Sequence, residues 1–282
     1  MLAHNGVHVD VVYPECCGMP QLEQGLIKNV NDRAERIASV LVPFIHQGFK
    51  VVTVVASCAL MLKKEWPLLS TSDVRGYLSL PYRSSRRSQS HTGMASFDQN
   101  VKLLADNTFD VSEYVMELSR TEVRHQPCES ERGDSEVVSL CLTTNARAQG
   151  LVAGRKPLDG AVSLHHACHA RAQNMGFKAR DMLKLIPSTL VMPMERCSGH
   201  GGSWGAELKA ILKDVAKAES AQTQAPPAVD SERVHYVASD CPLAQDHLVQ
   251  GVHLLEQQHG SKLVKRHPIE LLAMSYGLYP TQ

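Results

Sequence analysis

The feature that most constrains this chain is the position of its cysteines, because most of them follow apolar runs that end in a turn. The chain has eight cysteines, and six of them stand where a predicted strand ends: Cys16, Cys17, Cys58, Cys168, Cys197 and Cys241. In an open parallel sheet, the carboxyl ends of the strands border the binding crevice. The pattern therefore predicts thiols gathered at the edge of an α/β sheet.

The apolar runs alternate with helical periodicity. Apolar, β-branched runs typical of buried parallel strands lie at 7–13, 50–56, 161–165, 189–194 and 234–238. Apolar residues recur at helical spacing in the segments 22–47, 172–185, 205–218 and 267–276. Strand and helix in alternation predict an α/β fold with parallel sheets.

The pattern occurs twice, which predicts two similar Rossmann-like halves with cysteines at the C-terminal strand ends. The spacing from Cys16 to Cys58 is close to that from Cys197 to Cys241. A length of 282 residues suits two domains. We assign a first domain to 1–122, with an aperiodic insertion at 70–100, and a second domain to 156–282. The polar stretch 123–155 between them is predicted to be a disordered linker or insertion.

The chemistry of the first cysteine set favours a soft metal centre. Thiolates select iron–sulfur clusters, Zn²⁺ or Cu(I) over hard ions. Cys16 and Cys17 on one turn, with Cys58 from the neighbouring strand, predict three metal ligands. Structural zinc sites usually contain a CxxC pair, which this chain lacks, but zinc stays an alternative. Gly18 here, and Gly199 in the second half, predict tight turns beside a cofactor.

The second set combines cysteines with histidines. We expect Cys168, Cys197 and Cys241 to be its metal ligands. His165, His169 and His200 accompany them as cofactor-binding candidates. Imidazole can coordinate a metal, carry a proton or orient a ligand, and the sequence leaves these roles open.

Charge and hydropathy exclude some functions and indicate a compartment. The formal net charge is zero, so no overall field attracts nucleic acid. No apolar run reaches the length of a membrane span, and the N-terminus does not resemble a signal peptide. We therefore expect a cytoplasmic protein, with at most peripheral membrane association through partners at the inner face of the cell membrane.

Six segments together resemble a known family, the cysteine-rich CCG-domain iron–sulfur proteins. The matching segments are ECCGMP at 15–20, ASCALMLK at 56–63, HHACH at 165–169, RCSGHGG at 196–202, SDCPLA at 239–244 and HPIELLA at 267–273. Such domains occur in pairs in the B subunit of heterodisulfide reductase and in the C subunit of anaerobic glycerol-3-phosphate dehydrogenase, which the chain resembles most.

The resemblance implies a [4Fe-4S] cluster and an electron-transfer subunit, rather than a self-sufficient enzyme. Implied partners are a flavoprotein dehydrogenase subunit, of glycerol-3-phosphate or 2-hydroxy-acid type, and a ferredoxin-type domain. Electrons would pass between the flavoprotein and a quinone or another carrier. The chain departs from the family where Ser198 replaces a cysteine and where a cysteine expected upstream of Cys16 is missing. We expect from this an N-terminal truncation.

Two other interpretations stay open. The thiols could perform thiol–disulfide chemistry, with Cys16–Cys17 or Cys168–Cys197 as the redox pair. Alternatively, the chain could be a zinc-binding or degenerate fragment without catalytic activity.

Overall fold

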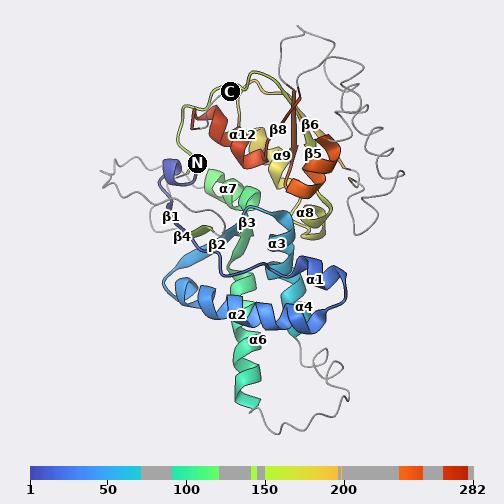
Figure 1. Cartoon of the computed structure of the whole chain (residues 1–282). Helices are drawn as coiled ribbons and strands as arrows, with labels where there is room; N and C mark the ends of the chain where they lie inside the picture. Colours follow the sequence, from blue (N-terminus) through green and yellow to red (C-terminus); the bar gives the residue numbers. More distant parts are fainter. Residues whose placement is uncertain are drawn as a thin grey trace.

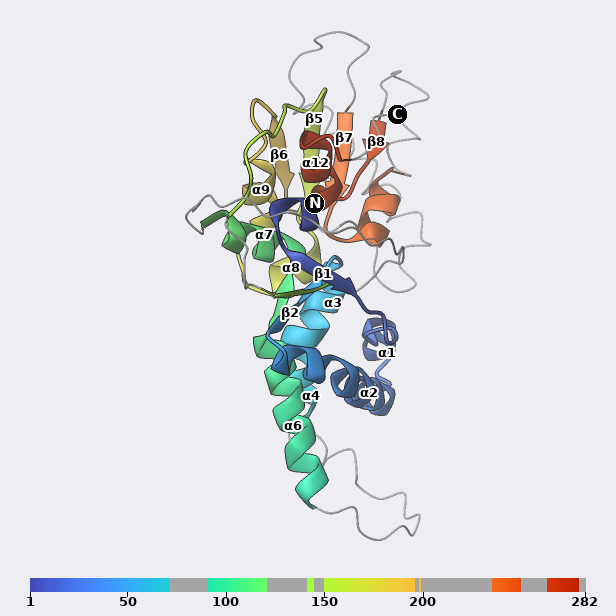
Figure 2. The same ribbon diagram turned by 90° about the vertical axis from the view of Figure 1, so that its left-hand side faces the viewer.

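The computed structural model of the chain describes residues 1–70, 91–120, 141–144, 150–195, 198, 235–249 and 263–278. Within these ranges the architecture is α/β, with two four-stranded sheets in the strand orders β1-β4-β2-β3 and β6-β5-β7-β8. Figures 1 and 2 show the second sheet at one end of the molecule and helices α2, α4 and α6 at the other. The α/β class predicted from the alternating pattern is confirmed.

Among the described residues, the first sheet contains one strand that precedes the long helix at 27–46 in the sequence and three strands that follow it. Its strands are β1 (His8–Val11), β2 (Phe49–Thr53), β3 (Thr108–Asp110) and β4 (Cys141–Thr144). β2 and β3 run parallel, whereas β4 pairs antiparallel with both β1 and β2. The first sheet is therefore mixed, since β4 enters it in the opposite direction.

Most of the described residues of the first half are helical. The helices are η1 (Ala3–Asn5), α1 (Met19–Glu23), α2 (Ile27–His46), α3 (Ala56–Leu60), the π-helical η2 (Met61–Glu65), α4 (Trp66–Ser70), α6 (His91–Asp106) and α7 (Val111–Arg120). The apolar stripe of α2 buries Val30, Ile37 and Leu41 completely, as its helical periodicity predicts. No helix in the described ranges is long and apolar enough to cross a membrane.

The second sheet is parallel throughout. Its strands are β5 (Ala161–His165), β6 (Val191–Met194), β7 (His235–Ser239) and β8 (Leu263–Lys265). Its helices include α8 (Cys168–Ala172), α9 (Lys178–Leu183) and α12 (Pro268–Ser275), and residues 242–249 are also helical. The helix expected at 205–218 lies outside the described residues.

Several expectations from the sequence differ from the structure. The helix expected at 22–47 begins only at Ile27, and of the one expected at 172–185 only the last residue of α8 and all of α9 are α-helical. The buried parallel strand expected at 7–13 is instead β1, which pairs antiparallel with β4 at the edge of the sheet that the described residues form, and most residues of β1 are exposed. Cys141–Thr144 forms β4, although it falls in the stretch predicted as linker. His91–Asp106 forms a helix that begins within the predicted insertion, because Phe97, Val101 and Leu104 bury one face of it. The domain boundaries themselves stay a prediction.

One hydrophobic core joins the two sheets. A single cluster of buried side chains contains Val52 and Val115 from the first half together with Leu164, Met182 and Leu271 from the second. A second cluster, around α2 and α6, belongs to the first half alone. Because burial of apolar surface is the main stabilising contribution, the shared cluster holds the halves together.

Candidate metal centre

Cys16 and Cys17 lie on a turn that leads from β1 into α1. Gly18, at the N-cap of α1, has a φ of 91°, which lies in the left-handed region that favours glycine. A Cβ at Gly18 would meet Arg33 Cδ at 3.4 Å. The tight turn predicted at Gly18 is therefore present, while its role beside a cofactor stays a prediction.

Charged side chains fix this turn to α2. Arg33 Nη1 donates to Glu15 Oε2 at 3.0 Å and to the carbonyl oxygen of Cys16 at 3.4 Å. Arg36 donates to both oxygens of Glu15, at 2.6 and 3.1 Å. The hydrogen bond from Arg36 lowers the pKa of Glu15, so the carboxylate keeps its charge.

The thiols of Cys17 and Cys58 meet below the turn. Cys58 belongs to α3, which follows β2, and its sulfur lies close enough to the Cys17 thiol for each to act on the pKa of the other. Sharing of a proton between the two sulfurs lowers the pKa of Cys58 and raises that of Cys17, whose thiol is also buried. Cys16 is close enough for its thiol to interact with Cys17 and for its charge to act on Cys58. Cys58 is therefore the more acidic thiol of the pair.

The side chains at this site are of the type that binds a soft metal, but their arrangement in the described ranges does not form a group of metal ligands. The thiols of Cys16, Cys17 and Cys58 interact with one another, and thiolates bind iron–sulfur clusters and zinc. In the part of the chain that the structure describes, no group of three or more His, Cys, Asp or Glu side chains is placed to hold a metal ion. The metal-ligand roles of these cysteines stay predictions.

The second predicted set is described only in part. Cys168 is exposed at the first position of α8, while His169 beside it is partly buried. Cys241 is partly buried after β7, and burial raises the pKa of its thiol. The remaining predicted residues, Cys197, Gly199 and His200, lie outside the described residues.

His165 lies inside the second sheet rather than at an open site. Its ring is buried, and Nδ1 lies 3.0 Å from Ser239 Oγ on the neighbouring strand. Ser239 Oγ also accepts a hydrogen bond from the backbone N–H of Cys241, at 3.2 Å. His165 is thus connected through Ser239 to the backbone of one predicted ligand.

The two cysteine sets approach each other where the halves meet. The backbone N–H of Ala56, at the start of α3, donates to the carbonyl oxygen of Asp240 at 3.2 Å. Cys241 packs against the small cluster of Ala56, Ala167 and Ala170. Figure 1 shows α3 beside α8, in agreement with these contacts.

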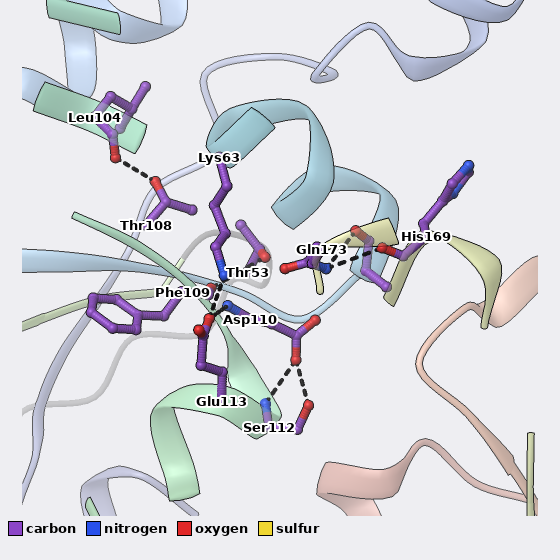
Figure 3. A network of polar contacts seen from close by, with 11 residues as sticks. Thr53, Lys63, Leu104, Thr108, Phe109, Asp110, Ser112, Glu113, His169 and Gln173 are labelled. Atoms are coloured by element: carbon purple, nitrogen blue, oxygen red, sulfur yellow. Dashed lines mark hydrogen bonds and ion pairs between the residues drawn. The ribbon is translucent and has the colours of Figure 1, made fainter. Parts of the chain in front are cut away.

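Sequence reasoning missed a polar network at this junction, which Figure 3 shows around Asp110 and Gln173. Asp110 Oδ1 accepts hydrogen bonds from the backbone N–H and the hydroxyl of Ser112, at 2.9 and 2.5 Å. Lys63 Nζ pairs with Glu113 at 2.5 Å. The sequence signal for this network is Asp110 at the end of β3, but a strand of three residues is too short to be recognised from its pattern.

Asp110 and Asp240 are two buried carboxyl groups at this junction. Their exposed fractions are 1% and 2%, and Asp240 Oδ1 has no hydrogen-bond partner. Burial raises the pKa of both groups, and the charge of Asp110 raises that of Asp240 further. Uncharged carboxyl groups are therefore favoured at this junction.

Comparison with known proteins gives one distant similarity. No family model matches the chain, and no solved structure matches it. The chain is similar to the B subunit of the fumarate reductase (CoM/CoB) of Methanothermobacter marburgensis, with 23% identity over 282 residues. This alignment covers 98% of the chain but 42% of the relative, so the chain spans less than half the length of that protein.

Proposed function

We propose that this chain is an iron–sulfur electron-transfer subunit of an oxidoreductase complex. The observation that carries the proposal is the proximity of Cys17 and Cys58, which follow two different strands and pack in the same buried cluster. The relative is named as the B subunit of a fumarate reductase, which supports a role beside other subunits in a redox reaction. The CCG-like segments around both cysteines supply the cluster type, [4Fe-4S].

In this proposal the chain's own residues hold and insulate the cluster. Cys16, Cys17 and Cys58 would supply thiolates at the first site, and Cys168, Cys197 and Cys241 at the second. When bound, a cluster accepts and releases single electrons, with a potential set by burial, charge and hydrogen bonds to its sulfurs. Arg33 brings a positive charge to the Cys16 carbonyl, which favours the more negative, reduced state.

The partners follow from what such a subunit needs. It requires an electron donor and an electron acceptor. As donor we propose a flavoprotein dehydrogenase of glycerol-3-phosphate or 2-hydroxy-acid type, and as acceptor a quinone or a ferredoxin-type domain. Attachment to the cytoplasmic face of the membrane would then occur through these partners.

Metal and sulfide content tests the proposal. After anaerobic reconstitution, we expect about four iron and four acid-labile sulfide per occupied site, with an EPR signal on reduction. Cys17→Ser should abolish the signal from the first site, whereas Cys128→Ser, outside the strand-end pattern, should retain it. Absence of sulfide from the reconstituted wild-type chain would refute the proposal.

A second candidate function is reduction of a disulfide, and the same thiol contact favours it. In this version the redox pair is Cys17 and Cys58, whereas the sequence suggested Cys16–Cys17 or Cys168–Cys197. Cys58 thiolate would attack the substrate disulfide and expel one thiolate, which takes up a proton. Cys17 would then displace the second thiol, leaving a Cys17–Cys58 disulfide that a dithiol or a reduced partner must reopen.

The two candidates are distinguished by the metal-free chain. Rapid reduction of a small disulfide by chain without iron, lost in Cys58→Ser, would establish the thiol reaction. Zinc bound stoichiometrically without sulfide would instead support the non-catalytic alternative.

A further inference from the structure

One residue of the second half reaches the helix that carries Cys58. Gln173, at the C-cap of α8, is 4% exposed, and its Nε2 donates to the carbonyl oxygen of Ala56 at 3.2 Å. The same nitrogen donates to the carbonyl oxygen of His169 at 3.4 Å. Because both partners are acceptors, only the amide nitrogen can face them, which fixes the orientation of the side chain.

Ala56 is held by the second half at both of its backbone polar groups. Its carbonyl accepts from Gln173, and its N–H donates to the carbonyl of Asp240 at 3.2 Å. An N–H in the first turn of a helix has no partner within the helix, so an external acceptor satisfies it here. Ala56 is fully buried against Ala167 and Ala170, whose small side chains let α3 and α8 approach closely.

The position of Ala56 determines the position of Cys58. Both residues belong to α3, a single short helix, and the Cys58 backbone N–H bonds back to Val55 at 3.0 Å. Cys58 also packs against the buried cluster that contains Cys17, which belongs to the other cysteine segment. A shift of the start of α3 therefore moves one sulfur of the pair while the other stays fixed by its own turn.

We infer that Gln173 is a positioning residue for Cys58, so that the first cysteine site is completed by the second half of the chain. The inference rests on the proposed role of Cys58 as ligand or nucleophile. It makes the two predicted domains one functional unit, because the thiol pair of the first depends on a side chain of the second.

The test is the rate at which Cys17 and Cys58 form a disulfide in the metal-free, full-length chain. Diamide takes two electrons and two protons from the thiols, and peptide mapping identifies the product. Gln173→Leu removes a buried hydrogen bond, which contributes about 1 kcal/mol. Because that free energy corresponds to a factor of about five in rate, we expect the Cys17–Cys58 disulfide to form about five-fold more slowly. Gln173→Met, a flexible side chain of similar length, provides the same test if the leucine variant does not fold.

Gln245→Leu is the matched control. Gln245 is also buried, and its Nε2 donates to two backbone carbonyls, of Val237 and Arg266, at 2.8 and 2.6 Å. We expect this control to lose stability without slowing the disulfide. In reconstituted chain, Gln173→Leu should also alter the EPR spectrum of the first site, a change that general destabilisation does not produce.

The possible outcomes separate this inference from the proposed function. Equal disulfide rates in Gln173→Leu and wild type, or equal slowing in Gln245→Leu, would overturn the inference even if a cluster binds. A specific slowing in Gln173→Leu, with no iron or sulfide in the wild type, would support the positioning role and refute the iron–sulfur function.

Discussion

The indole N–H of Trp66 donates a hydrogen bond to the carbonyl oxygen of Cys17 at 3.2 Å, inside the hydrophobic core. Trp66 is 1% exposed and begins α4, so the core itself fixes one side of the cysteine turn. Arg33 binds the carbonyl of Cys16 from the other side. The backbone of both adjacent cysteines is thus held by side chains that the motif ECCG does not contain.

Trp66→Phe keeps the aromatic bulk but removes the donor. The carbonyl of Cys17 then loses its partner in a buried place, so we expect the free energy of unfolding to fall by about 1–3 kcal/mol. Urea denaturation of the metal-free chain measures this. An unchanged midpoint and slope would show that the hydrogen bond contributes nothing.

Arg33→Met and Arg36→Met separate the carbonyl contact from the ion pair. Both arginines bind Glu15, but Arg33 is also bonded to the Cys16 carbonyl and is less exposed, at 27% against 59% for Arg36. Because an exposed ion pair contributes little to stability, Arg36→Met should change the free energy of unfolding little. Arg33→Met should in addition speed alkylation of Cys16 several-fold, measured by mass spectrometry. Equal alkylation rates in both variants would contradict a role for the carbonyl contact.

His267→Asn should reduce the loss of unfolding free energy that occurs as the pH falls below about 6.5. His267 Nδ1 accepts from the Ile269 N–H at the N-cap of α12, and burial lowers its pKa from 6.5 to about 4. The native state therefore favours neutral imidazole: its contribution is complete above about pH 6.5 and is lost as the pH falls towards 4. Asparagine can cap the helix without titrating. Urea denaturation at several pH values should show a steeper loss in wild type than in the variant.

Asp240→Asn should stabilise the metal-free chain at neutral pH. Burial and the charge of Asp110 raise the pKa of Asp240, so the native state opposes ionisation that the unfolded chain permits. Wild type then loses stability as the pH rises above the ordinary carboxyl range, towards the raised pKa, whereas the variant does not.

The expected gain for Asp240→Asn is about 1–3 kcal/mol at pH 7, absent at pH 3, by urea denaturation. Asp246→Asn serves as control, because Asp246 is partly exposed and pairs with Lys265 at 2.6 Å. A stability difference independent of pH would exclude ionisation of Asp240 as its cause.

Local pattern was sufficient for the elements around the cysteines. The periodicity of 22–47 predicted α2, and the apolar runs 50–56 and 161–165 predicted β2 and β5, because burial on one or both faces leaves a regular trace in sequence. The short strands β3 and β4 left no such trace. Their residues are ordered by pairing with β2, a long-range interaction that no local window contains.

The sequence by itself determined the α/β class, because alternating strand and helix patterns leave a regular trace. It also predicted that Cys16, Cys17 and Cys58 form one site, which stays a prediction. Only the tertiary structure decided that Cys58 lies near Cys17, that Trp66 and Arg33 hold the turn, and that Gln173 reaches Ala56 from the other half. The physical reason is that a side chain donates to a backbone carbonyl only when the fold brings the two groups within bonding distance. The spacing of residues along the sequence does not determine that distance. Which side chain supplies them is settled only when the helices pack.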